Sequence, residues 1–162
     1  VYRWLQIPLA GFTPGGSEQA PMAIAGTRVA VNICYEDAFG REIARQAAGA
    51  GLLVNMSNMA WYGESLAAEQ HAQFSQMRAL ETSRWMLRAT NTGVTAAIDE
   101  QGEVVAAMPQ FKRGVLTVDA QPRSGTTPYT RVGDALALAI LAALLVLAIS
   151  SSRGKRATPA AS

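Results

Sequence analysis

Short apolar runs, bounded by glycine, proline or polar residues, alternate with helix-type patterns over most of the chain before residue 121. Residues 28–33 and 52–56 are rich in aliphatic side chains and are predicted to be buried strands. Apolar residues recur at helical spacing between these runs, over residues 37–48, and again over residues 66–82. This order of strand, helix, strand and helix predicts a layered α/β fold with helices packed on a sheet.

Further short strands are expected after the second helix. Glu100-Gln101-Gly102-Glu103 is a turn signal, so the runs on either side of it are predicted to form a hairpin. Residues 1–27 are expected to be irregular, because prolines and the Gly15-Gly16 pair interrupt them. The additional predicted strands are residues 86–89, 93–98, 104–108 and 115–118.

The pattern changes at residue 121. Residues 121–131 are rich in proline, glycine, serine and threonine, and are predicted to be a linker. Residues 132–152 contain one charge, Asp134, and would form a helix about 31 Å long. We expect this helix to cross a membrane. The alternative, a buried core helix, would need a later element to cover it.

A basic tail, residues 153–162, follows the apolar run and begins with Arg153, Lys155 and Arg156. The positive-inside rule places this tail in the cytoplasm and the preceding domain outside. A lipid-anchor attachment signal is disfavoured because the apolar run is not terminal. The chain starts without methionine, in a stretch typical of a domain interior, so we expect a fragment of a longer protein.

Composition narrows the function classes. The 162 residues are 49% hydrophobic and 16% charged, which suits one domain-sized core. The net charge is only +2 and the basic residues before the tail are scattered, so no nucleic-acid partner is expected. The single cysteine allows no internal disulfide and no cysteine-rich zinc site, and we expect no metal.

That cysteine, Cys34, follows the predicted strand at residues 28–33 and precedes a predicted helix. A thiol at such a corner is presented at the carboxyl edge of a sheet, beside free backbone N–H groups. Nucleophilic chemistry would also need a base and a donor for the developing oxyanion. The alternative is that Cys34 is a small buried hydrophobic residue.

Other polar residues have two readings each. His71 is either a base for Cys34 or a histidine whose hydrogen bonds serve the core. Glu36 either orders the site or favours the start of a helix. Arg78 and Glu81, three residues apart on the predicted helix, are most simply a surface ion pair.

Two aromatic residues, Trp61 and Tyr62, occur in the polar loop between a predicted strand and the long helix. They either belong to the core or line an apolar substrate pocket. The loop position leaves both readings open.

Cys34-Tyr35-Glu36 after a buried strand resembles the cysteine motif of the nitrilase (carbon–nitrogen hydrolase) superfamily. A longer series, in order from about residue 5 to 150, resembles more specifically the apolipoprotein N-acyltransferase family. Its motifs are Leu5-Gln6-Ile7-Pro8, Ile33-Cys34-Tyr35-Glu36, Ser57-Asn58-Met59-Ala60-Trp61-Tyr62-Gly63, Gln70-His71, Met77-Arg78-Ala79-Leu80-Glu81, Arg88-Ala89-Thr90-Asn91-Thr92-Gly93, Gln101-Gly102-Glu103, Pro109-Gln110-Phe111 and Thr127-Pro128-Tyr129-Thr130-Arg131-Val132-Gly133.

The resemblance implies a four-layer αββα sandwich, of which residues 1–120 would be the C-terminal part, and a Glu-Lys-Cys catalytic set. Cys34 matches the nucleophile, the backbone N–H of Tyr35 an oxyanion donor, and Glu36 a supporting acid. The glutamate base and the lysine belong upstream of this sequence, so the fragment alone is expected to be inactive. Met59 stands where the family usually has aspartate, which argues against a carboxylate role in this loop.

The implied reaction moves an acyl chain from a membrane phospholipid, through a cysteine thioester, to the amine of a diacylglyceryl-cysteine at a lipoprotein N-terminus. It needs no cofactor, and its partners are the phospholipid, the apolipoprotein and the bilayer. The implied location is the bacterial inner membrane with the catalytic domain on the periplasmic side. Trp61 and Tyr62 would help to keep water from the thioester.

Two rival functions remain open at this point. One is a carbon–nitrogen hydrolase, an amidase or nitrilase, that cuts a small amide or nitrile with the same cysteine. The other is an inactive, membrane-anchored fragment. The apolar run at residues 132–152 counts against the first.

Overall fold

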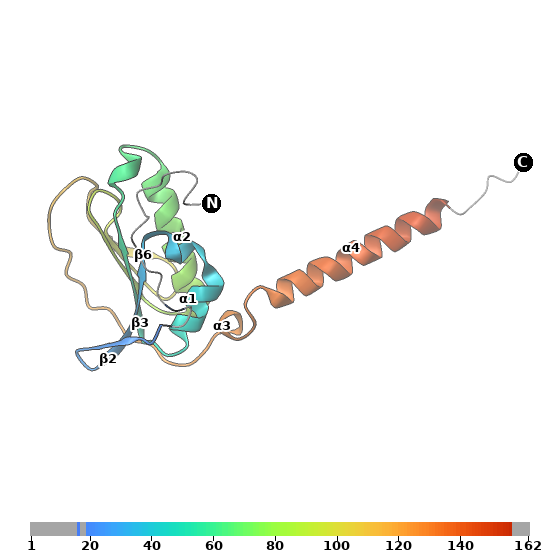
Figure 1. Ribbon diagram of the computed structural model, residues 1–162, viewed down its shortest axis with the longest axis horizontal. Helices are drawn as coiled ribbons and strands as arrows, with labels where there is room; N and C mark the ends of the chain where they lie inside the picture. Colours follow the sequence, from blue (N-terminus) through green and yellow to red (C-terminus); the bar gives the residue numbers. More distant parts are fainter. Residues whose placement is uncertain (1–15, 17–18, 157–162) are drawn as a thin grey trace, which may run out of the picture.

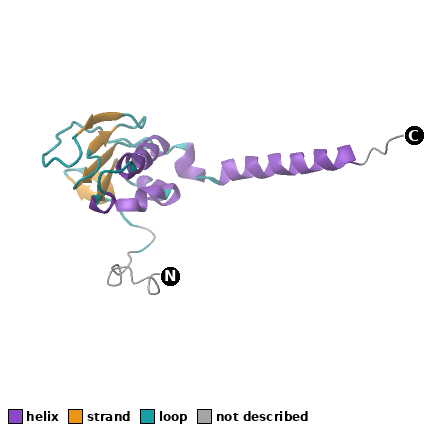
Figure 2. Ribbon diagram, turned by 90° about the horizontal axis from the view of Figure 1, so that it is seen from above, coloured by secondary structure: helices purple, strands orange, loops and turns teal. Residues whose placement is uncertain are grey.

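The computed structural model describes residue 16 and residues 19–156, with side chains up to residue 151. A six-stranded sheet carries two helices on one face, and a long helix extends away from this body (Figures 1 and 2). The strands are β1 (Met22–Ile24), β2 (Thr27–Ile33), β3 (Leu52–Ser57), β4 (Met86–Thr90), β5 (Ala96–Ile98) and β6 (Val104–Ala107). The helices are α1 (Gly40–Ala47), α2 (Ala67–Thr82), α3 (Pro128–Val132) and α4 (Ala135–Arg156), with 3₁₀ turns η1 (Cys34–Ala38) and η2 (Ala60–Tyr62).

The strands lie in sequence order across the sheet. β2, β3 and β4 pair in parallel, whereas β1, β5 and β6 add antiparallel neighbours. Because parallel strands end at the same edge, the segments that follow β2, β3 and β4 come together there. This edge therefore gathers η1, the loop with η2, and the turn after Thr90.

The core lies between the sheet and the helices α1 and α2. Its fully buried large side chains include Ile43 of α1, Leu53 of β3 and Met86 of β4. Burying each such side chain stabilises the fold by about 1.5–3 kcal/mol. Alanines such as Ala47 and Ala79 let the helices approach closely. Within the described residues, the sheet and its helices form an α layer and a β layer, two of the four layers of the expected sandwich.

The strands predicted at residues 28–33, 52–56 and 86–89, the hairpin and the long helix at residues 66–82 are confirmed. The helix predicted over residues 37–48 begins only at Gly40, because residues 34–38 form the 3₁₀ turn η1. Phe39, one of the apolar residues in that predicted helix, is 55% exposed. The strand predicted at residues 93–98 begins at Ala96, after a turn.

Two predictions about strands are wrong. Residues 115–118 form no strand, and Val115 is 90% exposed, because no sheet edge among the described residues pairs with this segment. Residues 22–24, expected to be irregular, form β1 instead. Ala25 and Gly26 both have positive φ, 47° and 79°, which suits a two-residue turn between antiparallel strands.

The predicted linker, residues 121–131, is partly helical. Pro128 begins α3, and the Thr127 hydroxyl caps it by accepting from the N–H of Thr130 at 3.1 Å. The helix predicted at residues 132–152 corresponds to α4, which starts at Ala135. Among the residues with described side chains, no helix reaches the combined length and apolarity of a membrane span. Residues 5–9 and the tail at 157–162 lie outside the described residues.

The expected surface ion pair of Arg78 and Glu81 is instead partly buried. The two side chains are 9% and 18% exposed, and their charged atoms are 2.9 Å apart. α3 covers them, and Thr127 donates to the carbonyl of Glu81 at 2.5 Å. Burial raises the pKa of Glu81 from its ordinary value, and the nearby Arg78 charge opposes that shift. This polar contact fixes α3 on α1 and α2.

Gly40, the first residue of α1, makes that contact possible. A Cβ here would lie 2.6 Å from the Tyr129 hydroxyl and overlap the Arg78 guanidinium. Gly40→Ala should therefore destabilise the protein by about 1–3 kcal/mol, the usual cost of overpacking. Thermal unfolding of the full-length protein in detergent measures this change.

Gly49→Ala is the matched control, because its Cβ would meet only Pro21 at 3.5 Å, an ordinary contact. Equal unfolding temperatures for the two variants would contradict the close approach of Arg78 and Tyr129 to Gly40.

Candidate active site

Cys34 begins the η1 turn directly after β2 and has φ of 54°, in the left-handed region. A non-glycine residue there carries backbone strain, and such strain is typical of functional sites. Two donors hold the Cys34 carbonyl: the Asn55 side-chain amide at 2.9 Å and His71 Nε2 at 3.2 Å. These contacts fix the turn that places Cys34 in the wall of an open pocket.

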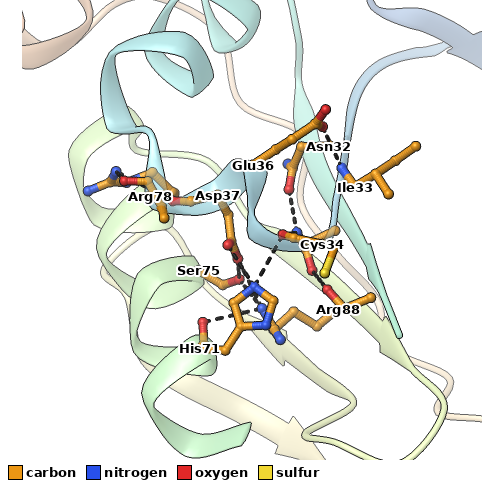
Figure 3. A network of polar contacts seen from close by, with 12 residues as sticks. Asn32, Ile33, Cys34, Glu36, Asp37, His71, Ser75, Arg78 and Arg88 are labelled. Atoms are coloured by element: carbon orange, nitrogen blue, oxygen red, sulfur yellow. Dashed lines mark hydrogen bonds and ion pairs between the residues drawn. The ribbon is translucent and has the colours of Figure 1, made fainter. Parts of the chain in front are cut away.

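Glu36 stabilises the same turn from the other side. Its carboxylate accepts a hydrogen bond from the backbone N–H of Ile33 at 2.6 Å (Figure 3). The bond closes the strand end onto η1, and a role of Glu36 in the chemistry stays a prediction. The neighbouring Tyr35 ring is half-exposed and meets Phe39 and Phe74 edge to face.

Asp37, the fourth residue of η1, is fully buried and has three partners. Its carboxylate accepts from His71 Nε2 at 2.8 Å, from the Ser75 hydroxyl at 2.5 Å and from Arg88 Nη1 at 3.0 Å. A buried carboxylate needs such paired and hydrogen-bonded partners to offset its desolvation. This network ties the cysteine turn to α2 and β4.

Arg88 supplies the positive charge of the network from the middle of β4. Its Nη1 also donates to the Ser75 hydroxyl at 2.5 Å, and its Nε to the carbonyl of Val94 at 3.3 Å. Burial lowers the pKa of Arg88, and the negative charges of Asp37 and Cys34 oppose that shift. The guanidinium therefore lies close enough to Cys34 to interact with it electrostatically.

His71 is engaged with groups other than the thiol. Nε2 faces Asp37 and the Cys34 carbonyl, and Nδ1 lies 3.0 Å from the Met59 sulfur. No hydrogen bond between described residues joins His71 to the Cys34 sulfur. These contacts favour the interpretation of His71 as a histidine whose hydrogen bonds serve the core over its interpretation as a base for Cys34. Met59 is buried, and Gly93 leaves it room, since a Cβ there would lie 2.7 Å from Met59 Cγ.

A pocket of about 440 Å³ opens beside Cys34. Tyr35 and Tyr62 line it together with residues of the first half of α2, among them His71 and Phe74. Trp61 is 78% exposed and is not among the lining residues. The structure thus brings Tyr62, but not Trp61, to the wall of this pocket. Within the described part of the chain, no cluster of acidic, histidine or cysteine side chains is suited to a metal ion.

A thiol at a strained strand end, above a pocket and near a buried cation, suits nucleophilic chemistry on an acyl group. The profile of the carbon–nitrogen hydrolase family matches residues 7–129. The chain belongs to the carbon–nitrogen hydrolase family.

Curated relatives are similar in sequence. An apolipoprotein N-acyltransferase of Nitrosomonas europaea is 51% identical over 98% of this chain and 33% of its own length. That of Chromobacterium violaceum is 50% identical over 92% of this chain and 29% of its own length. The chain therefore spans about a third of the length of these relatives.

Solved carbon–nitrogen hydrolases are similar in fold. The enzyme of Helicobacter pylori G27 has a TM-score of 0.56 at 14% identity, over 63% of this chain and 43% of that one. A variant of an amidase from Nesterenkonia sp. AN1 has a TM-score of 0.51 at 21% identity, over 62% and 42%. These likenesses show that the sheet and its helices have the nitrilase-like α/β fold.

Sequence reasoning gave no role to Asp37, Ser75 or Arg88. The sequence did contain a signal for Arg88. It is the one charged residue in the strand Met86–Thr90. A buried arginine requires an acid, and Asp37 stands next to the family's cysteine motif. Only the structure shows that Arg88 pairs with Asp37, because 51 residues separate the two in the sequence.

Asp37→Asn should destabilise the full-length protein by about 3–5 kcal/mol, because it leaves the Arg88 charge buried without its partner. It should also slow alkylation of Cys34 by iodoacetamide, since the turn would lose its anchor. Thermal unfolding and the alkylation rate measure the two effects. Asp119→Asn removes the same charge at an exposed site and is the control. Equal behaviour of the two variants would contradict the anchoring role of Asp37.

Proposed function

We propose that this chain is the C-terminal part of an apolipoprotein N-acyltransferase. The enzyme would transfer an acyl chain from a phospholipid to the N-terminal amine of a diacylglyceryl-cysteine lipoprotein. The observation that carries the proposal is Cys34, held at φ 54° over a pocket of about 440 Å³ in a chain about half identical to such enzymes. The chain spans about a third of those relatives, so the activity belongs to the longer protein.

Cys34 is the nucleophile in this proposal. Its thiolate attacks the ester carbonyl, the ester C–O bond breaks, and the lysophospholipid oxygen leaves with a proton. The amine of the acceptor then attacks the thioester, an amide forms, and the thiol is regenerated. The backbone N–H of Tyr35 donates to the developing oxyanion, as the family resemblance implies. Glu36 acts as a positioning residue, supported by its 2.6 Å bond to the N–H of Ile33.

The base and the lysine of the catalytic set lie upstream of this chain in the proposed full-length enzyme. Among the described residues, Arg88 supplies a buried positive charge that interacts with Cys34. Tyr62 supports the proposed apolar wall of the pocket, and Trp61 lies exposed beside it. In this proposal Trp61 contacts the lipid or the upstream part of the domain.

We further propose that α4 is the membrane helix. Its large apolar side chains are 45–65% exposed along the described part, for example Leu141, Leu145 and Val146. A helix of 22 residues is about 33 Å long, close to the thickness of a bilayer core. Residues 1–120 then form part of the catalytic domain on the periplasmic side of the inner membrane. Residues 121–131 connect it to the span at 132–152, and 153–162 lie in the cytoplasm.

Cys34→Ser in the full-length enzyme should lower acyl transfer from phospholipid to a diacylglyceryl-cysteine peptide by at least about 10³-fold. The reason is that a hydroxyl at this position replaces the thiolate as nucleophile and is far weaker. Mass spectrometry measures the rate at which the N-acylated peptide forms. The same circular dichroism spectrum and unfolding temperature as the wild type would show that the variant folds.

Unchanged transfer by Cys34→Ser would contradict the nucleophile assignment. Release of free fatty acid or of ammonia from small amides, without transfer to the peptide, would favour the hydrolase instead.

A reporter fused after Ser162 tests α4. A fluorescent protein that matures only in the cytoplasm should be bright, and alkaline phosphatase, active only in the periplasm, should be silent. Placing arginines at Leu141 and Leu145 should reverse both signals, because each arginine at the centre of a span costs about 2.5–3.5 kcal/mol. Val115→Arg, at an exposed site outside α4, should change neither signal. Phosphatase activity in the unmutated fusion would contradict the proposed span.

A further inference from the structure

A second cavity, of about 490 Å³, lies at the same edge of the sheet as Cys34. One wall is the end of β4 and the turn after it, including Thr90, Asn91 and Thr92. The other wall is the segment after β6, including Lys112 and Arg113. β4 runs parallel to β2, so the turn after β4 and the cysteine turn lie at the same edge of the sheet.

The lining of this cavity is positively charged. Lys112 and Arg113 form no ion pair and no side-chain hydrogen bond with any described residue, and no carboxylate is among the lining residues. Hydroxyl and amide groups of Thr90, Thr92 and Asn91 complete the wall. Two free cations beside several hydrogen-bond donors suit an anionic oxygen group, and phosphate above all.

The segment that carries the two cations is folded against the sheet edge. The N–H of Met108 donates to the Thr95 carbonyl at 2.9 Å, and that of Phe111 to the Thr92 carbonyl at 3.3 Å. Phe111 has a φ of 58°, an uncommon conformation that turns the chain back on itself. Lys112 and Arg113 are therefore presented to the cavity by a defined backbone rather than by a free tail.

A hydrogen bond links the wall of this cavity to the wall of the cysteine pocket. Asn91 lines the cavity, and its side-chain oxygen accepts from the N–H of Met59 at 2.9 Å. Its amide donates to Asn58 at 2.7 Å. Met59 in turn lines the pocket of Cys34. The ends of β2 and β4 are two strand spacings apart, about 10 Å. This distance is on the scale of the glycerol and phosphodiester of one phospholipid taken together.

We propose that this cavity binds the headgroup phosphodiester of the phospholipid donor and thereby places its ester at Cys34. The inference rests on the proposed function and adds to it the subsite that selects a phosphate-bearing donor. Lys112 and Arg113 contact the phosphate oxygens. A donor without phosphate gains nothing from this cavity.

The test uses the full-length enzyme in mixed micelles and follows acylation of Cys34 with two donors. One donor is phosphatidylglycerol, and the other is a p-nitrophenyl fatty-acid ester, which has no phosphate. Lys112→Gln combined with Arg113→Gln should raise KM for the phospholipid about tenfold, with kcat nearly unchanged, through loss of charge-assisted contacts. The p-nitrophenyl ester should react as with the wild type.

Arg28→Gln combined with Arg45→Gln is the matched control. It removes the same charge from two exposed residues at the opposite edge of the sheet, at the start of β2 and the end of α1. This control should leave KM for both donors unchanged. Raising the salt concentration should weaken phospholipid binding by the wild type and by the control more than by the Lys112/Arg113 variant.

Two soluble competitors distinguish the sources of phosphate. Glycerophosphoglycerol, the headgroup diester without acyl chains, should compete with the phospholipid in the wild type and lose this effect in the Lys112/Arg113 variant. Stronger competition by inorganic phosphate than by the diester would overturn the headgroup assignment in favour of free phosphate.

Equal loss of activity with both donors, or no change with either, would also overturn the proposal. Failure of the proposed function gives a different result, because the wild-type enzyme would then leave Cys34 unacylated by any phospholipid.

Discussion

The buried carboxylate of Asp37 is the constraint on which the candidate site depends. It joins its own turn to α2, through His71 and Ser75, and to β4, through Arg88, and it lies in the same short turn as Cys34. Removing one partner of such a buried ion pair strongly destabilises a protein. The intact pair itself adds little stability compared with hydrophobic residues of similar volume. The network therefore specifies one geometry for the turn. The left-handed φ of Cys34 persists because the surrounding contacts over-determine it.

The sheet supplies the frame for this arrangement. Parallel β2, β3 and β4 end at one edge, which collects the cysteine turn, the Met59 loop and the Asn91 turn. Asn91 links the last two through its side chain, and Asn55 links β3 to the Cys34 carbonyl. Polar side chains thus connect neighbouring strand ends, while the apolar core on the helix face holds the strands in register. The site therefore consists of turns and loops that are held at the ends of regular strands.

Local patterns predicted the parts of the fold that depend on local contacts. The strands at β2, β3 and β4, the long helix and the β5–β6 hairpin follow from residue types and turn signals. The same reasoning failed where a distant partner decides the outcome. Residues 115–118 have strand-type residues but pair with no described strand, whereas β1 forms by pairing with β2. Arg78 and Glu81 were expected at the surface, but α3 returns from far along the chain to cover them.

The candidate site shows the same division. Cys34, Tyr35 and Glu36 could be found from the sequence, because they follow a predicted strand and match the cysteine motif of the family. The partners of Asp37 come from positions 34 to 51 residues away, so only the folded chain reveals them.

The most direct test of the account is to incubate the full-length enzyme with phospholipid alone, without acceptor, and locate the acyl group by mass spectrometry. The account predicts a hydroxylamine-sensitive thioester on Cys34, within the tryptic peptide 29–41. Acyl groups only at other positions, or none, would contradict it.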